Sequence, residues 1–197
     1  MYVDPHKVII ADCDGVLLDW VYSFTRWMDK KGYNIKVKNE YRINKQFGIS
    51  YMEGRRLIRE FNESADIAFL TPHLDAIKYV KKLHEEYGYV FHVVSSMGNS
   101  PAAIDLRKEN LRNLFGKTVF EEITILDTGA DKDEALEPYR DSGCFWVEDK
   151  PENAEVGVEL GLDGILMEHD YNVNYLHADI KVAKNWKEVY NIITGEV

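Results

Sequence analysis

Short apolar segments recur along the chain, and a stretch with helical spacing follows each of them. The segments are Lys7–Ala11, Tyr89–Ser95, Glu122–Leu126, Cys144–Glu148 and Gly164–Met167. Runs of this kind are typical of parallel strands, because helices cover both faces of a parallel sheet. The alternation predicts an α/β fold, a doubly wound (Rossmann-like) parallel sheet with right-handed crossovers.

Proline marks the expected start of three helices. Thr71-Pro72 is predicted to cap and open a helix that ends at Gly88, Ser100-Pro101 opens another, and Pro151 opens a third that runs to about Gly161. Proline is favoured at the first helical position because its missing N–H would have no partner there.

The interval between the first two predicted strands breaks this rhythm. Residues 17–70 contain helical patterns but no strand pattern, with an apolar face along Trp20–Lys31 and a capping-box sequence over Ser50–Glu53. We therefore expect an α/β core domain of residues 1–16 and 71–197, and a small all-helical cap domain of residues 17–70. Ligands bind beyond the carboxyl ends of the strands in such sheets, so an insertion at this point can act as a lid.

Composition excludes several classes of function. The 197 residues carry 24 basic and 34 acidic side chains, a formal net charge of −10. A phosphate backbone needs a basic face, so a nucleic-acid partner is not expected. No apolar run is long enough to cross a bilayer, and the N-terminus has no signal-peptide pattern, so neither a membrane partner nor secretion is expected.

The two cysteines also favour a protein that is not secreted. The two cysteines, Cys13 and Cys144, lie in apolar, strand-like runs and cannot build a disulfide framework. Buried thiols in a cytoplasmic protein are the expectation. The sequence leaves the oligomeric state open.

Polar residues stand at the carboxyl ends of four predicted strands. Asp12 and Asp14 follow the first strand and precede Gly15, which permits an unusual backbone turn. Two carboxylates this close are costly unless a cation lies between them, and Mg²⁺ prefers oxygen ligands. An ordinary acidic turn is the competing interpretation.

The other three strand ends carry complementary chemistry. Ser95 and Ser96 end the second strand, Lys132 follows the third, and Glu148-Asp149 ends the fourth. Hydroxyls can donate to phosphate oxygens, a lysine can neutralise an anion, and the acids resemble a metal site. Taken singly, each could be a helix cap, a surface lysine or an acidic loop.

In this order the four signals resemble the haloacid dehalogenase superfamily. The corresponding segments are Ile9–Val16, Val93–Ser95, Lys132 and Val147–Asp149. The helical insertion resembles the cap that many members carry at that position.

The resemblance implies a Mg²⁺-dependent phosphomonoester hydrolase. Asp12 would be the nucleophile that forms an aspartyl-phosphate, and Asp14 the acid and base. Asp12, Asp14 and Asp149 would hold Mg²⁺, with Glu148 helping directly or indirectly. Ser95, Ser96 and Lys132 would bind the phosphoryl oxygens.

Two positions refine this expectation. Members of the superfamily that cleave carbon–halogen bonds lack an acid at the position of Asp14, so this residue favours phosphate esters. Val16 stands where threonine is frequent, and Lys132 lacks the usual following proline, which leaves Lys117 as a fallback.

The substrate depends on the cap, whose aromatic residues and Arg55 and Arg56 are candidates for contact. Leu17–Trp20 and Glu148–Asn153 look like the 5′-nucleotidase and deoxyribonucleotidase branch. The expected substrate is a nucleoside 5′-monophosphate or a similar small phosphorylated metabolite. The alternatives are a sugar-phosphate phosphatase or phosphoglucomutase-like enzyme, a phosphatase of proteins or nucleic-acid ends, and a non-catalytic interaction protein on the same fold.

Overall fold

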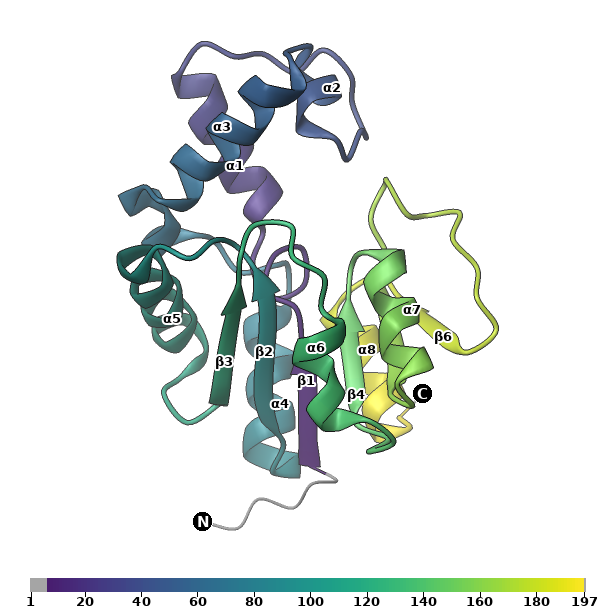
Figure 1. The fold of residues 1–197 in the computed structure, drawn as a ribbon. Coiled ribbons are helices and arrows are strands. Elements are labelled where there is room, and N and C mark those ends of the chain that lie inside the picture. Colours follow the sequence, from purple (N-terminus) through teal and green to yellow (C-terminus); the bar gives the residue numbers. More distant parts are fainter. Residues whose placement is uncertain (1–6, 197) are drawn as a thin grey trace.

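The computed structural model describes residues 7–196 and contains a single parallel sheet (Figure 1). Its six strands lie in the order β3-β2-β1-β4-β5-β6. The strands are β1 (Val8–Ala11), β2 (Val90–Ser96), β3 (Phe120–Leu126), β4 (Phe145–Glu148), β5 (Asp163–Met167) and β6 (Ile180–Ala183). Because β1 pairs with β2 on one side and β4 on the other, the strand order reverses beside β1, where open α/β sheets bind ligands.

All five predicted strands are present, and β6 is the one that the sequence pattern missed. Only its first and last residues are buried. Lys181 and Val182 between them are exposed, because β6 lies at the edge of the sheet. Such a strand has no continuous apolar run to detect.

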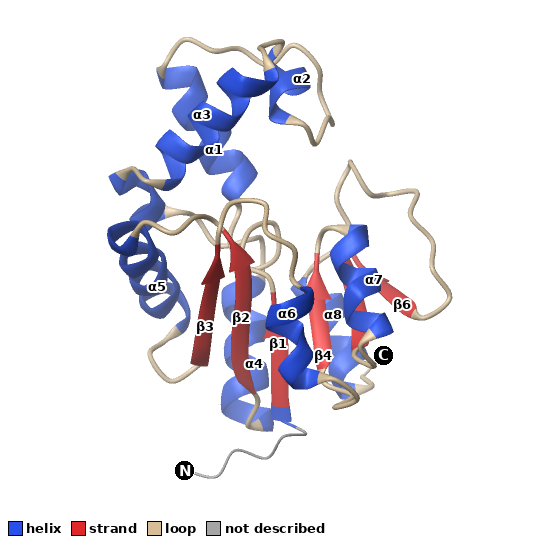
Figure 2. Cartoon of the chain, in the orientation of Figure 1, coloured by secondary structure: helices blue, strands red, loops and turns tan. Residues whose placement is uncertain are grey.

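Helices cover both faces of the sheet, as Figure 2 shows. The core helices are α4 (Ala76–Tyr87), α5 (Pro101–Phe115), α6 (Asp133–Leu136), α7 (Pro151–Glu159) and α8 (Trp186–Thr194), with a short 3-10 helix, η3 (Glu137–Tyr139). Successive residues of β1 enter opposite cores: Ile9 packs in one hydrophobic cluster and Ile10 in another. The doubly wound prediction is therefore confirmed.

The predicted start of the first core helix is wrong. The helix α4 begins at Ala76, after a turn at Leu74 and Asp75, and Pro72 before that turn forms a β-bridge with Leu18. The carbonyl of Thr71 accepts from the Asp19 amide at 2.9 Å, and the His73 amide donates to the Leu17 carbonyl at 2.9 Å. The residues around Pro72 thus bond the segment that leaves the insertion to the segment that enters it. These bonds use backbone groups that a helix would need.

Between β1 and α4 the described chain forms helices and no strand of the sheet. They are α1 (Trp20–Lys30), α2 (Ile43–Phe47), α3 (Tyr51–Asn62) and a 3-10 helix, η2 (Ala65–Phe69), and α1–α3 stand above the sheet edge in Figure 1. Rings of Trp20, Phe24 and Phe61 pack against one another at centroid distances of 4.6–5.6 Å, with Trp20 stacked on Phe24 and the Phe61 ring edge-on to both. The buried aromatic residues of the insertion therefore pack against one another, within the hydrophobic cluster that they share with one face of the sheet.

Both cysteines are buried, in different hydrophobic clusters. Burial raises the pKa of the Cys13 thiol to about 12, so this thiol is not a thiolate nucleophile. Within residues 7–196, every helix is too short or too polar to pass through a lipid bilayer.

Candidate active site

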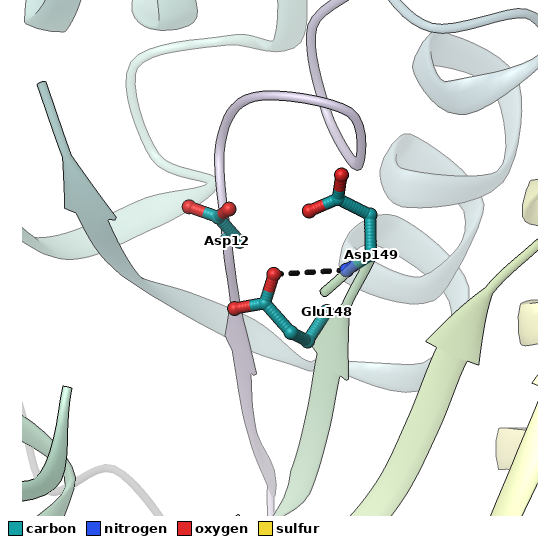
Figure 3. Close-up of side chains that lie close together, drawn as sticks. All are labelled: Asp12, Glu148 and Asp149. Carbon is teal, nitrogen blue, oxygen red and sulfur yellow. Dashed lines mark hydrogen bonds between the residues drawn. The ribbon is translucent and has the colours of Figure 1, made fainter. Parts of the chain in front are cut away.

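The chain brings three acidic side chains together at the carboxyl ends of β1 and β4. Asp12, Glu148 and Asp149 each place an oxygen within 4.8 Å of the others (Figure 3). The pairing of the two strands continues into this edge, because the Asp12 amide donates to the Val147 carbonyl at 2.9 Å. All three acids are buried, so their charges interact in a medium that screens poorly.

Lys132 lies among these acids. Its Nζ is 3.0 Å from Asp12 Oδ1 and 2.7 Å from Glu148 Oε2, and only 2% of the residue is exposed. Burial lowers the pKa of the Lys132 ammonium, but Asp12 and Glu148 outweigh it and raise the pKa above its usual value. Lys132 is therefore a buried cation beside the predicted nucleophile.

Glu148 has both oxygens occupied by groups of the protein itself. Oε1 accepts from the amides of Asp149 (2.9 Å) and Lys150 (3.1 Å), and Oε2 accepts from Lys132 Nζ and Asn153 Nδ2 (3.2 Å). Four donors around one carboxylate hold it in place. We infer that Glu148 orients Lys132, and that Asp12 and Asp149 are better placed to bind a cation.

The other two acids lack sufficient compensating charge. Burial raises the pKa of Asp12 to about 7, although Lys132 opposes this shift. Burial likewise raises the pKa of Asp149 to about 6. A buried pair of oxygen donors whose charged form is disfavoured suits a hard divalent cation such as Mg²⁺, so the donor set fits the expected metal.

Asp14 lies outside this group of acids. Its carboxylate forms an ion pair with Arg107 of α5, whose Nη1 also donates to Cys13 Sγ at 3.0 Å. Arg107 is fully buried, and sequence reasoning missed it because an arginine within a helix is usually solvent-exposed. Asp14 still lines the cavity described below.

The two serines at the end of β2 have different surroundings. Ser95 is buried and lines the cavity. Ser96 donates its hydroxyl to the carbonyl of Ala130 at 3.0 Å, two residues before Lys132. Ser96 therefore supports the loop that carries the lysine.

A cavity of about 910 Å³ lies between the strand ends and the helical insertion. Its core wall includes the four predicted strand ends. Its other wall includes Trp20, Tyr41, Tyr51 and Arg55, the last with its guanidinium over the Tyr51 ring. Ligand pockets are commonly about 300–1,000 Å³, so a small metabolite fits this space.

The two candidate arginines of the insertion differ. Arg56 is paired with Glu53 and Glu60, at 2.8 and 2.9 Å, and is not one of the residues that line the cavity. Among residues 7–196, no carboxylate forms an ion pair with Arg55, which does line the cavity. The structure thus separates one arginine available to a ligand from one engaged in the insertion's surface.

A loop after β5 completes the site, and the sequence reasoning missed it. Tyr171 donates its hydroxyl to Asp149 Oδ2, and His169 Nε2 lies 2.7 Å from the carbonyl oxygen of Gly15. Gly15 has φ 80°, and a Cβ there would lie 2.5 Å from Asp149 Oδ2. The signal was present, because the polar run Glu168–Asn172 directly follows the fifth predicted strand.

Comparisons with known proteins bear on the fold of the chain. No protein-family model matches the chain. An uncharacterised 32.4 kDa protein of Enterobacteria phage T4 is 28% identical over 142 residues, which is 68% of this chain and 49% of the phage protein. The chain thus spans about half the length of this relative.

Solved structures resemble the whole chain. The haloacid dehalogenase-like hydrolase SP0104 from Streptococcus pneumoniae superimposes with a TM-score of 0.66 at 16% identity, over 95% of this chain and 98% of that one. The L-2-haloacid dehalogenase of Xanthobacter autotrophicus gives 0.62 at 11%, over 97% and 99%. CbbY from Rhodobacter sphaeroides, solved with phosphate, gives 0.60 at 14%, over 93% and 96%.

At these identities the likeness establishes architecture, and it does so over nearly the full length of each chain. The six-stranded parallel sheet with flanking helices agrees with it. The chain therefore has the fold of the haloacid dehalogenase-like hydrolases.

Proposed function

We propose that this protein is a Mg²⁺-dependent hydrolase of small phosphomonoesters that works through an aspartyl-phosphate on Asp12. The observation that carries the proposal is the meeting of Asp12, Lys132 and Asp149 at one sheet edge, inside a cavity of metabolite size. A nucleophile, a cation and a pair of metal-binding oxygens are the parts that phosphoryl transfer needs.

In the first step, a carboxylate oxygen of Asp12 forms a bond to phosphorus while the bond to the ester oxygen breaks. The leaving oxygen takes a proton from Asp14, which lines the same cavity and must leave its ion pair with Arg107 to carry that proton. Lys132 and Ser95 hold the phosphoryl oxygens. In the second step, water attacks phosphorus and gives its proton to Asp14, which releases phosphate and restores Asp12.

Asp12 and Asp149 would hold the Mg²⁺. Asp14 is proposed as a further ligand of the metal on the family resemblance alone. When bound, the metal offsets the repulsion between the carboxylate nucleophile and the anionic phosphate. The raised pKa of both Asp12 and Asp149 supports this assignment, because a cation would favour their charged forms.

The retained acid at Asp14 favours phosphate esters over carbon–halogen substrates, on the family resemblance described above. For the rest of the substrate we propose a nucleoside 5′-monophosphate. Tyr41 and Tyr51 present exposed rings to the cavity, and such rings stack well on a base.

A phosphate-release panel tests the proposal. We expect Mg²⁺-dependent release from nucleoside 5′-monophosphates that stops with EDTA and returns with added Mg²⁺. Sugar phosphates and bisphosphates belong in the panel, because CbbY was solved with xylulose-1,5-bisphosphate. Turnover of sugar phosphates alone would overturn the nucleotide assignment, and no turnover even of an aryl phosphate would favour a non-catalytic protein. Activity indifferent to EDTA would contradict the metal assignment.

The two arginines of the insertion give a matched test of substrate contact. We expect Arg55→Ala to raise KM for the preferred nucleotide about tenfold with kcat little changed, because a cation that only binds substrate acts equally in the ground and transition states. Arg56→Ala should leave both constants unchanged, since Arg56 pairs with Glu53 and Glu60. Steady-state kinetics of the two variants would contradict this assignment if their KM values rose equally.

A further inference from the structure

We propose that Tyr171 is a positioning residue that holds Asp149 ready for the metal, and that Tyr41 of the helical insertion braces it. This inference rests on the metal assignment in the proposed function. Its first support is direct: the Tyr171 hydroxyl donates to Asp149 Oδ2, and the two residues lie on the loops after β5 and β4.

The loop that carries Tyr171 is fastened on both sides of the site. The Asn172 side chain donates to the carbonyls of Asp149 (2.7 Å) and Met167 (2.9 Å) and accepts from the His169 amide (2.7 Å). His169 in turn contacts the Gly15 carbonyl in the loop after β1. Tyr171 is therefore held between anchors on both of the loops that supply the acids.

Two rings pack against the Tyr171 ring, one from its own loop and one from the insertion. The Tyr171 ring stacks on His169 at 5.1 Å with an interplanar angle of 11°. Its other ring neighbour is Tyr41, at 5.0 Å, in the segment between α1 and α2. Through Tyr41, the insertion thus contacts Tyr171, the residue that donates to Asp149.

The contact has a specific chemical consequence. A hydroxyl that donates to one oxygen of a carboxylate limits its rotation and directs the remaining lone pairs. Partners of this kind are worth about 10–100-fold in metal affinity. Asp149 also receives no ion pair from Lys132, which lies nearest Asp12 and Glu148. Tyr171 is therefore the side-chain donor on which the position of the Asp149 carboxylate depends.

Calorimetric titration of the metal-free protein with Mn²⁺ tests this without any turnover. We expect Tyr171→Phe to weaken Mn²⁺ binding about tenfold or more while the melting temperature of the metal-free protein changes little. The matched control is Tyr175→Phe, which removes a hydroxyl bonded to Glu155 at 2.7 Å from the same connection between β5 and β6. This control should bind Mn²⁺ as the wild type does.

A third variant tests the brace. Tyr41→Ala removes one aromatic pair and should weaken Mn²⁺ binding by about two- to tenfold. Tyr22→Ala, at an exposed ring on α1 outside the cavity, should have no effect.

The outcomes distinguish failure of the metal site from failure of the roles given to Tyr171 and Tyr41. The positioning role alone would be overturned if the wild type binds Mn²⁺ and Tyr171→Phe binds it equally tightly. It would also be overturned if Tyr171→Phe and Tyr175→Phe lose the same amount of Mn²⁺ affinity. An unchanged Tyr41→Ala affinity would overturn the brace. A wild-type protein that fails to bind Mn²⁺ would overturn the metal site itself, and the positioning role with it.

Discussion

Asp12→Asn should lower kcat for phosphate release by roughly 10⁴-fold or more, because loss of a nucleophile removes the covalent route altogether. An amide keeps the shape of the side chain but is a far weaker nucleophile toward phosphorus. Steady-state phosphate release with saturating Mg²⁺ measures the effect. The matched control is Asp170→Asn, an exposed acid lining the same cavity, which should retain activity. Asp12→Asn protein with near wild-type turnover would remove Asp12 from the nucleophile role.

Asp12→Asn should not destabilise the fold, so its loss of activity would not be due to misfolding. Burial raises the pKa of Asp12 to about 7 in the folded protein, from 3.8. The folded state therefore binds a proton more readily than the unfolded state, and this contribution to stability is lost as pH rises from about 4 through 7. In the metal-free protein, Asp12→Asn should melt above the wild type at pH 8, with a smaller difference at pH 5.

Lys132→Met should have the largest effect on stability. Lys132 is the buried cation between Asp12 and Glu148, and its loss leaves two buried carboxylates without a counter-charge. Removing one partner of a buried ion pair costs about 3–5 kcal/mol. We expect a loss of this size in the free energy of unfolding of the metal-free protein, measured in urea, together with loss of phosphate release.

Lys117→Met is the control and also tests the fallback assignment. Lys117 is exposed and precedes β3, so it lies at the opposite end of that strand from Lys132. It should change neither stability nor activity. Loss of activity in Lys117→Met, with Lys132→Met active and stable, would reverse the two roles.

The strand pattern was predictable because buried parallel strands are short, continuous apolar runs. The carboxyl ends of such strands share one edge, so the sequence alone indicates that Asp12 and Asp149 lie together although they are far apart along the chain. The limits of the pattern are equally physical. Edge strand β6 is half exposed, and Thr71-Pro72 pairs with another segment rather than opening a helix.

Contacts made by single side chains were beyond that reasoning. Nothing in the periodicity of α5 indicates that Arg107 is buried and pairs with Asp14, because the burial of an arginine depends on its partner and not on its neighbours in sequence. The separation of Arg55 from Arg56 likewise depends on which direction adjacent helical residues face. Glu148 and Asp149 are equivalent acids in the sequence, yet four donors surround one of them.

The claim that Asp12 accepts the phosphoryl group can be tested directly by trapping it. Wild-type protein turning over its preferred phosphomonoester with Mg²⁺ would be quenched in acid, digested and examined by mass spectrometry. We expect a phosphoryl adduct on the peptide that contains Asp12, absent from Asp12→Asn and from protein treated with EDTA. An adduct on a different residue, or rapid turnover with no adduct on any peptide, would contradict it.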